Sequence, residues 1–122
     1  MVKRVLFVDD DPNLRKTYCH SLRSSGFEVV EAADGKSAFN SIISRNPDLV
    51  VCEVMLPVLN GFDLLQRIRQ RPSTAHLPVV IITDLEDEAS MAKKLGADAY
   101  LVKSKTNPAE LVSKITALSD KN

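Results

Sequence analysis

The chain has 122 residues, of which 44% are hydrophobic and 26% are charged, so it has the size and apolar content of one globular domain. Sixteen Lys and Arg residues balance sixteen Asp and Glu residues, which argues against direct nucleic-acid binding through a general basic surface. No apolar run approaches the ~20 residues of a membrane span, the first run is too short for a signal peptide, and two cysteines cannot form a disulfide framework. We therefore expect a cytoplasmic protein.

Five short apolar runs predict five β-strands, and helical patterns separate each run from the next. The runs cover Val5–Val8, Val29–Val30, Leu49–Cys52, Val79–Ile82 and Tyr100–Val102. Four of them are continuous rather than alternating, and they are rich in β-branched residues. This pattern is typical of strands that are covered on both faces.

The segments between these runs carry the signals of five helices. Polar residues mark where four of the helices begin: Asp11, Asp34, Asn60 and Asn107. Gly96 marks the end of the remaining helix. Strands and helices alternate strictly, and parallel crossovers are right-handed, so the sequence predicts a doubly wound α/β domain with helices on both faces of a parallel sheet.

Charged and polar residues follow four of the predicted strands. Asp9 and Asp10 follow the first strand, Glu53 the third, Thr83 the fourth and Lys103 the fifth. Folds of this class bind ligands outside the carboxyl ends of their strands, so we expect these side chains to converge on one rim of the sheet. Grouped carboxylates suit a hard cation such as Mg²⁺, whereas a lysine and a hydroxyl suit an anion such as a phosphoryl group.

Motifs in five segments carry a resemblance that covers the whole chain. They are Val5-Leu6-Phe7-Val8-Asp9-Asp10-Asp11, Pro47-Asp48-Leu49-Val50-Val51, Met55-Leu56-Pro57 with Asn60-Gly61, Ile82-Thr83, and Gly96-Ala97-Asp98-Ala99-Tyr100-Leu101-Val102-Lys103. In these motifs and their order, the chain resembles the receiver domain of two-component response regulators. The resemblance implies a flavodoxin-like fold with strand order 2-1-3-4-5 and five helices. It also implies one receiver domain over residues 1–122, either a stand-alone protein or the N-terminal part of a longer response regulator.

The resemblance assigns roles to most of the residues at the strand ends. An acidic pair after the first strand binds Mg²⁺ in this family, which here means Asp9 and Asp10, and the backbone carbonyl of Met55 completes the protein ligands. A hydroxyl after the fourth strand bonds the phosphoryl oxygen, and Thr83 matches it. A lysine after the fifth strand pairs with the phosphoryl charge, and Lys103 matches it.

Glu53 stands where the family has the aspartate that accepts a phosphoryl group from a histidine kinase. Its carboxylate lies about one C–C bond, ~1.5 Å, further from the backbone, and in-line phosphoryl transfer depends on the position of the attacking oxygen. We expect phosphorylation to be slow and Glu53 to pair with Lys103 and accept from Thr83 instead. Mg²⁺ should then bind weakly to Asp9 and Asp10, with Glu53 as a further ligand.

Two more residues beside this site depart from the family's pattern. Asp84 follows Thr83 where a small residue usually leaves a path for the phosphodonor, so its bulk and charge should hinder an anionic donor. Ser104 follows Lys103 where a proline in a cis peptide is usual. A cis bond before a non-proline residue costs ~3 kcal/mol, so this loop is either rearranged or strained. An engineered Asp-to-Glu change would explain Glu53 but not these two residues.

The resemblance also implies a surface for protein partners. Family members usually signal through the fourth helix, the fifth strand and the fifth helix, where an aromatic residue of the strand changes rotamer. Tyr100 matches this aromatic residue, although it could simply be a half-buried aromatic of an edge strand. Met91, Lys93 and Lys94 are candidate contact residues on the fourth helix. We expect protein partners on this face, among which a second copy of the chain, a histidine kinase or a phosphotransfer protein are open alternatives.

The leading interpretation is an atypical receiver that is not an enzyme and acts through protein contacts. A conventional Mg²⁺-dependent phosphoacceptor receiver is the main alternative. A small Mg²⁺-dependent phosphohydrolase is less favoured, because no second general acid or base lies near the rim. A flavin or nucleotide domain is also less favoured, because Asp9-Asp10-Asp11 replaces the Gly-rich phosphate loop that would follow the first strand.

Overall fold

Five parallel strands form a single sheet in the order β2-β1-β3-β4-β5 in the computed structural model, which describes residues 1–120. The strands are β1 (Arg4–Val8), β2 (Glu28–Ala32), β3 (Leu49–Cys52), β4 (Val79–Thr83) and β5 (Ala99–Val102). The predicted doubly wound α/β fold and its strand order 2-1-3-4-5 are therefore confirmed. The last two residues of the predicted domain, 121 and 122, lie outside the described part of the chain.

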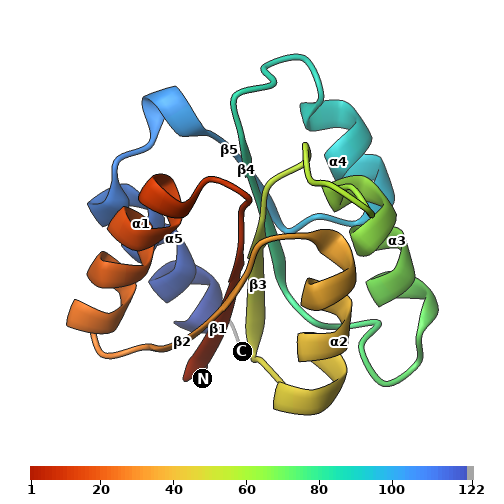
Figure 1. Cartoon of the computed structure of the whole chain (residues 1–122), viewed down its shortest axis with the longest axis horizontal. Coiled ribbons are helices and arrows are strands. Elements are labelled where there is room, and N and C mark those ends of the chain that lie inside the picture. The colour runs from red at the N-terminus through yellow and green to blue at the C-terminus, as the bar shows by residue number, and fades with distance from the viewer. Residues whose placement is uncertain (121–122) are drawn as a thin grey trace.

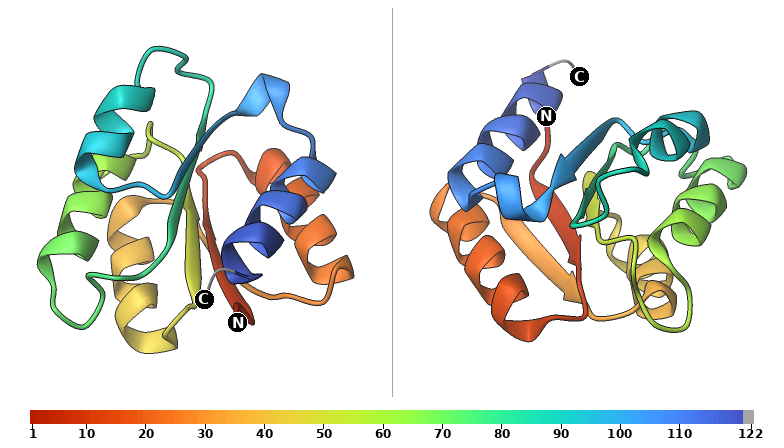
Figure 2. Two further views of the ribbon diagram at one scale, coloured as in Figure 1. Left: turned by 180° about the vertical axis from the view of Figure 1, so that it is seen from behind. Right: turned by 90° about the horizontal axis from the view of Figure 1, so that it is seen from above.

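Five α-helices and one short 3₁₀ helix connect the strands. They are α1 (Pro12–Ser24), α2 (Gly35–Arg45), α3 (Gly61–Gln70), α4 (Ala89–Leu95), η1 (Lys103–Lys105) and α5 (Pro108–Asp120). Helices α1 and α5 cover one face of the sheet, and α2, α3 and α4 cover the other (Figure 1). The same two layers are seen from behind and from above in Figure 2. Within residues 1–120, no helix is long and apolar enough to cross a membrane.

Polar side chains cap the helices where the sequence predicted. The Asp11 side chain accepts from two backbone N–H groups of the first turn of α1, and Asp34 accepts from the Ser37 N–H at the start of α2. Asn107 and Glu110 each accept from the backbone N–H of the other, which is a capping box at the start of α5. Each cap satisfies N–H groups that the helix itself leaves free.

Alternate residues of β1 enter two separate cores. Leu6 and Val8 pack with the buried residues of α2, α3 and α4, whereas Val5 and Phe7 pack with those of α1 and α5. All four are completely buried. Burying a side chain of this size contributes about 1.5–3 kcal/mol, so the continuous apolar run of β1 joins both layers to the sheet. This rigid centre fixes the position of the carboxyl ends of the strands.

Gly61 allows the chain to return against the end of β3. A Cβ atom at this position would lie 2.1 Å from the backbone oxygen of Glu53, a distance that no side chain tolerates. The Gly61 N–H donates to the Val54 carbonyl at 2.8 Å. The first turn of α3 therefore packs directly against the residues that follow β3, which lie at the predicted site.

Candidate functional site at the carboxyl ends of the strands

The sheet register places the predicted site residues of β1 and β3 side by side. Val8 pairs with Cys52, and the Glu53 N–H donates to the Val8 carbonyl at 3.0 Å, so Asp9 and Glu53 leave the sheet together. Lys103 follows β5, which pairs with β4 on the other side of β3. Parallel strands thus bring residues from three distant segments to one rim, as the sequence predicted.

One ammonium group joins two buried carboxylates at this rim. Lys103 Nζ lies 2.7 Å from Asp9 Oδ2 and 2.8 Å from Glu53 Oε1. The Asp9 side chain is fully buried, and the side chains of Lys103 and Glu53 are each 9% exposed. We call these three residues the ion triplet. The predicted pairing of Glu53 with Lys103 is present, and Asp9 is a second partner of Lys103 that the sequence did not indicate.

Backbone N–H groups occupy the other carboxylate oxygens of the ion triplet. The Asp11 N–H donates to Asp9 Oδ1 at 2.9 Å, and the Val54 N–H donates to Glu53 Oε2 at 2.6 Å. Glu53 therefore folds back onto the peptide that follows it. Glu53 Oε1 also accepts from the ammonium, whereas Asp9 Oδ2 meets the ammonium as an ion pair without a hydrogen bond of its own. Pairing and backbone bonds of this kind are what make buried charges tolerable in a protein interior.

The ion triplet keeps Lys103 charged. Burial lowers the pKa of the Lys103 ammonium, but its close contacts with Asp9 and Glu53 and the attraction of their charges outweigh burial and raise the pKa above its ordinary value of 10.5. Two carboxylates and one ammonium leave a net charge of about −1 at the centre of the rim. An approaching anion meets a lysine whose charge is already compensated.

Thr83 lies at the same rim but makes a different contact from the one expected. Its side chain is almost completely buried, and Oγ1 accepts from the Leu85 N–H at 3.4 Å. Among the described residues no hydrogen bond joins Thr83 to Glu53, so that expectation was wrong. The physical reason is that Glu53 turns its second oxygen toward its own Val54 N–H instead.

Asp84 and Ser104 form a bridge across the edge of the site. Asp84 Oδ1 accepts from the Ser104 N–H at 3.1 Å, which ties the end of β4 to η1. No cis peptide bond occurs within residues 1–120, so the Lys103–Ser104 peptide is trans. Of the two alternatives for this loop, the structure has the rearranged one, with residues 103–105 forming a 3₁₀ turn.

The expected magnesium ligands carry suitable oxygen atoms, but Asp9 is paired with Lys103, whereas Asp10 and Met55 are exposed. Asp10 is exposed, and Met55 is 64% exposed on the loop after β3. Asp9 gives its Oδ2 to Lys103 and its Oδ1 to the Asp11 N–H. Over residues 1–120, no group of three or more His, Cys, Asp and Glu side chains is arranged to hold a metal. Oxygen donors suit Mg²⁺, but the ammonium competes for the buried one.

The residues predicted for partner contacts lie on α4 and β5. Tyr100 is half-buried, and its hydroxyl donates to the Leu85 carbonyl in the loop between β4 and α4. Met91 is 43% exposed on α4, and Lys93 and Lys94 are exposed beside it. These residues do not touch the ion triplet, but the loop that carries Leu85 connects the two regions.

Sequence reasoning missed the backbone partners of the carboxylates and the Asp84 bridge. Every residue except proline has a backbone N–H, so residue types do not indicate that those of Asp11 and Val54 bond the carboxylates. Asp84 was predicted to hinder a donor, whereas its contact with Ser104 depends on a turn that the residue types did not reveal. The one sequence feature that pointed to Asp84 and Ser104 was that both depart from the residues usual in receiver domains.

The fold and its rim of acidic, hydroxyl and lysine side chains define a receiver domain. The response regulator receiver domain family matches residues 5–116, and the chain belongs to this family. It is thus a receiver domain of a two-component response regulator. Receiver domains of this family interact with histidine kinases and phosphotransfer proteins.

Similar proteins include both regulators and isolated receivers. The chain is 35% identical over 120 residues to the phosphate regulon transcriptional regulatory protein PhoB of Escherichia coli, covering 97% of this chain and 52% of that protein. It is 36% identical over 118 residues to the gliding motility regulatory protein of Myxococcus xanthus, covering 95% of this chain and 15% of that protein. The chain therefore spans about half, or much less, of the length of these curated relatives.

Solved structures of receivers superpose closely on this fold. A putative response regulator from Chloroflexus aurantiacus gives a TM-score of 0.89 at 34% identity, covering 96% of this chain and 97% of that one. The chemotaxis response regulator CheY4 of Vibrio cholerae gives a TM-score of 0.88 at 28% identity, covering 96% and 98%. The scaffold is thus ordinary for the family.

Proposed function

We propose that this chain is an atypical receiver whose own ion triplet occupies the phosphorylation site, and that it signals through protein contacts without an ordinary phosphorylation cycle. The observation that carries this proposal is the pair of contacts from Lys103 Nζ, 2.7 Å to Asp9 and 2.8 Å to Glu53. The chain is a binding module rather than an enzyme in this proposal. A small phosphohydrolase stays disfavoured, because within residues 1–120 no acidic or basic side chain beyond its own three members forms an ion pair or hydrogen bond with a side chain of the triplet.

Glu53 is poorly placed to accept a phosphoryl group. One of its oxygens is on Lys103 and the other is on the Val54 N–H. An attacking oxygen must approach phosphorus in line, and these two contacts fix the direction of the carboxylate and draw negative charge from both of its oxygens. The carboxylate brings a charge of about −1 where a phosphoryl group brings roughly −1.5 to −2, so Glu53 imitates the phosphorylated state only in part.

Magnesium binding is weak in this proposal. Asp9, Asp10 and the Met55 carbonyl would hold the ion, and Glu53 could reach it only by leaving Lys103. A bound Mg²⁺ would neutralise negative charge beside an incoming phosphoryl group. Asp9 must give up its ammonium partner to bind the cation, so we expect an affinity in the millimolar range or weaker, as for a site with one engaged and one exposed carboxylate.

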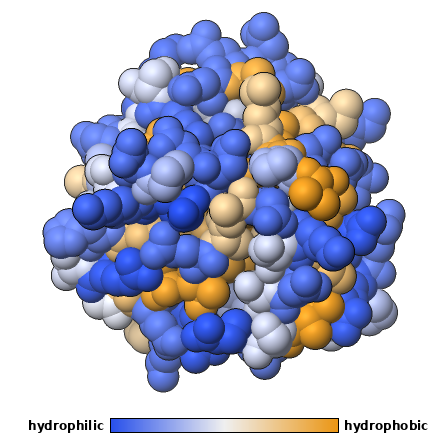
Figure 3. All heavy atoms as spheres, viewed as in Figure 1, coloured by the Kyte–Doolittle hydropathy of each residue, from blue (hydrophilic) through white to orange (hydrophobic). Residues whose placement is uncertain are grey.

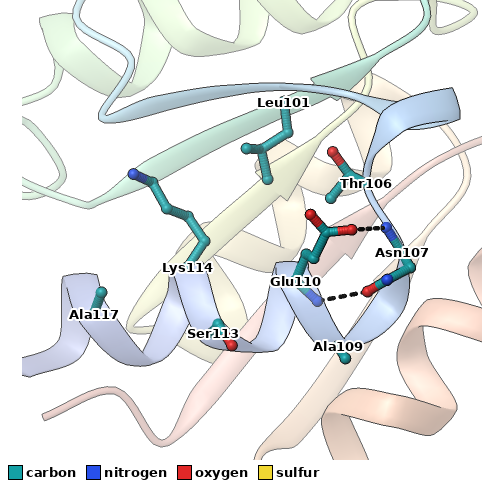
Figure 4. Close-up of a pocket in the computed structure, with 8 residues that line it drawn as sticks. All are labelled: Leu101, Thr106, Asn107, Ala109, Glu110, Ser113, Lys114 and Ala117. Carbon is teal, nitrogen blue, oxygen red and sulfur yellow. Dashed lines mark hydrogen bonds between the residues drawn. The ribbon is translucent and has the colours of Figure 1, made fainter.

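We assign partner contacts to the face formed by α4, β5 and α5. A groove of about 520 Å³ lies on this face beside α5, and its lining includes Leu101 of β5 and Glu110 and Lys114 of α5. Figure 4 shows Leu101 and Lys114 on opposite sides of this hollow, with Glu110 bonded to Asn107 at its end. Tyr100, Met91 and Lys94 lie on β5 and α4, on the other side of the β5 edge, where Tyr100 packs against the core under α2, α3 and α4. A histidine kinase, a phosphotransfer protein or a second copy of the chain are candidate partners.

A conventional phosphoacceptor receiver is the second candidate, because most of the site is retained. Asp9, Thr83 and Lys103 keep the residue types that the family uses, and Thr83 stays at the rim beside the triplet. In this alternative Glu53 accepts the phosphoryl group despite its length, or Glu53 is an engineered replacement of an original aspartate.

Intact mass after incubation with Mg²⁺ and acetyl phosphate decides between the two candidates. The proposal expects no phosphoryl mass on the parent chain and one on the Glu53→Asp variant, whose shorter carboxylate frees the space beside Lys103. A hydroxylamine-labile phosphoryl mass on the parent would overturn the proposal and establish the conventional receiver. Labelling of neither chain would mean that Asp84 and Ser104 also close the site.

A further inference from the structure

A groove on the opposite layer of the molecule has no role in the chemistry of the rim. It lies between α2, α3 and the loop after β3, has a volume of about 310 Å³, and is lined by Lys36, Phe39, Asn40, Val58, Leu59 and Arg67. We call it the α2–α3 groove. Apolar side chains in orange reach the mostly hydrophilic surface on this side of the molecule, over α2 and α3 (Figure 3).

The helix α2 contributes one continuous stripe to this groove. Lys36, Phe39, Asn40 and Ile43 follow the i, i+3, i+4, i+7 spacing that aligns side chains along one side of a helix. Ile43 is 43% exposed at the end of the stripe, and Phe39 is only partly buried. The stripe therefore presents apolar surface that the fold itself does not cover.

Val58 projects from the groove in a strained conformation. Its φ angle is +71°, and the Leu59 N–H donates to the Pro57 carbonyl at 2.8 Å, which together make the rare γ-turn with a positive-φ centre. A β-branched residue in this region is a genuine outlier. Its side chain is nevertheless 80% exposed, so no buried contact of Val58 compensates for the strain.

The strained turn is held rigidly against α2. A Cβ atom at Gly35 would lie 1.9 Å from the Leu59 carbonyl oxygen, so the first residue of α2 must be glycine for this packing to form. Leu59 itself packs against the core. The chain thus fixes in place an exposed apolar side chain in a groove that the partly buried Phe39 also lines, a feature that fits an anchor for a partner.

Two cationic side chains flank the apolar floor. Lys36 and Arg67 are both exposed, and neither forms a salt bridge with another residue of the described chain. The nearby Asp34 carboxylate accepts from the N–H and hydroxyl of Ser37 and attracts the Lys36 charge without forming a salt bridge to it. Asp63 lies four residues before Arg67 on α3 without pairing to it. The rim of the groove is therefore free to pair with carboxylates.

From these observations we infer that the α2–α3 groove docks an acidic amphipathic segment of another protein. One or two apolar side chains of that segment would seat against Phe39 and Val58, and its carboxylates would pair with Lys36 and Arg67. A basic segment would be repelled by the two cations.

The test is a titration of the ¹⁵N-labelled full chain with three synthetic peptides of equal length, followed by amide chemical shifts. The first is a 12-residue helical peptide with two leucines at i and i+4 among glutamates; the second has lysines for the glutamates, and the third has alanines for the leucines. We expect shifts centred on residues 36–43 and 57–67 with the first peptide only. The dissociation constant should be on the order of 0.1–1 mM, as for a small contact, and should rise with salt.

A matched pair of charge variants makes the result specific. Lys36→Glu combined with Arg67→Glu should weaken binding of the acidic peptide by ~10-fold or more, whereas Lys16→Glu at an exposed position of α1 should leave that binding unchanged. The proposal is overturned by equal binding of the lysine peptide, by shifts that map elsewhere, or by no shift at millimolar peptide. Concentration-dependent broadening of the groove amides without peptide would instead show that a second copy covers the groove, and would also overturn it.

Discussion

Replacing Lys103 with methionine should remove a large part of the stability of this domain. The ammonium lies 2.7 Å from Asp9 Oδ2 and 2.8 Å from Glu53 Oε1, so the sum of these distances, about 5.5 Å, is the largest possible separation of the two oxygens. With an effective dielectric constant of about 20, each attraction is ~6 kcal/mol and the repulsion between the carboxylates is at least ~3 kcal/mol. Desolvation of the ammonium offsets part of this. Removing one partner of a buried ion pair typically costs about 3–5 kcal/mol, and we expect this loss for Lys103→Met at neutral pH.

Urea unfolding followed by circular dichroism measures this loss directly. Lys114 is an exposed lysine on α5, so Lys114→Met is the matched control and should change the free energy of unfolding by about 0.5 kcal/mol at most. Adding Glu53→Gln to Lys103→Met should recover ~1–2 kcal/mol, because one of the two unpaired charges disappears. If Lys103→Met stays within about 1 kcal/mol of the parent, or if the added Glu53→Gln brings no recovery, the reasoning from the ion triplet is refuted.

Three further predictions follow from other parts of the structure, together with one on pH. Burial lowers the pKa of Lys103, but its two carboxylates raise it overall, so the stability gained from the triplet should be complete below pH 10.5 and should disappear as the pH rises through the raised pKa. Unfolding measured across this pH range should show that loss in the parent chain and not in Lys103→Met. Val58→Gly should raise the free energy of unfolding by about 1 kcal/mol by relieving the positive φ angle, and a decrease in urea unfolding would contradict the strain argument. Gly61→Ala should cost ~2–3 kcal/mol, since the new Cβ would meet the Glu53 backbone oxygen, and an unchanged melting curve would be the opposing result. In a Glu53→Asp background, Asp84→Ala should speed labelling by acetyl phosphate severalfold, because it removes a charge that repels an anionic donor; equal rates by mass spectrometry would show that Asp84 does not guard the site.

The sequence predicted the order of the elements well, because burial leaves a clear pattern. The continuous apolar runs of β1, β3 and β4 match strands that are buried on both faces. The predicted β2, by contrast, was the two residues Val29 and Val30, whereas the strand spans Glu28–Ala32. β2 is an edge strand whose glutamates face solvent, so apolar content alone marked only its centre.

At the site, sequence reasoning predicted the neighbours but not every contact. The length of the Glu53 side chain was enough to predict its pairing with Lys103. The second partnership, of Asp9 with Lys103, and the missing bond from Thr83 depend on side-chain torsion angles that no residue type encodes. The trans peptide before Ser104 is the ordinary form before a residue other than proline, whereas the 3₁₀ turn of residues 103–105 and its bond to Asp84 were not evident from the residue types.

The backbone of Val54 links the ion triplet to the layer of helices. Its N–H donates to Glu53 Oε2, and its carbonyl accepts from Gly61 at the first turn of α3. The two contacts come from the peptide groups on either side of the Val54 Cα, so a displacement of this residue's backbone changes both. Equilibrium coupling between two sites is reciprocal. If a partner bound to α3 changes the free energy of an event at the Glu53 carboxylate, that event changes the binding free energy of the partner by the same amount. A contact on α3 and a change of charge at the rim would thus both shift the same conformational equilibrium of the Val54 backbone.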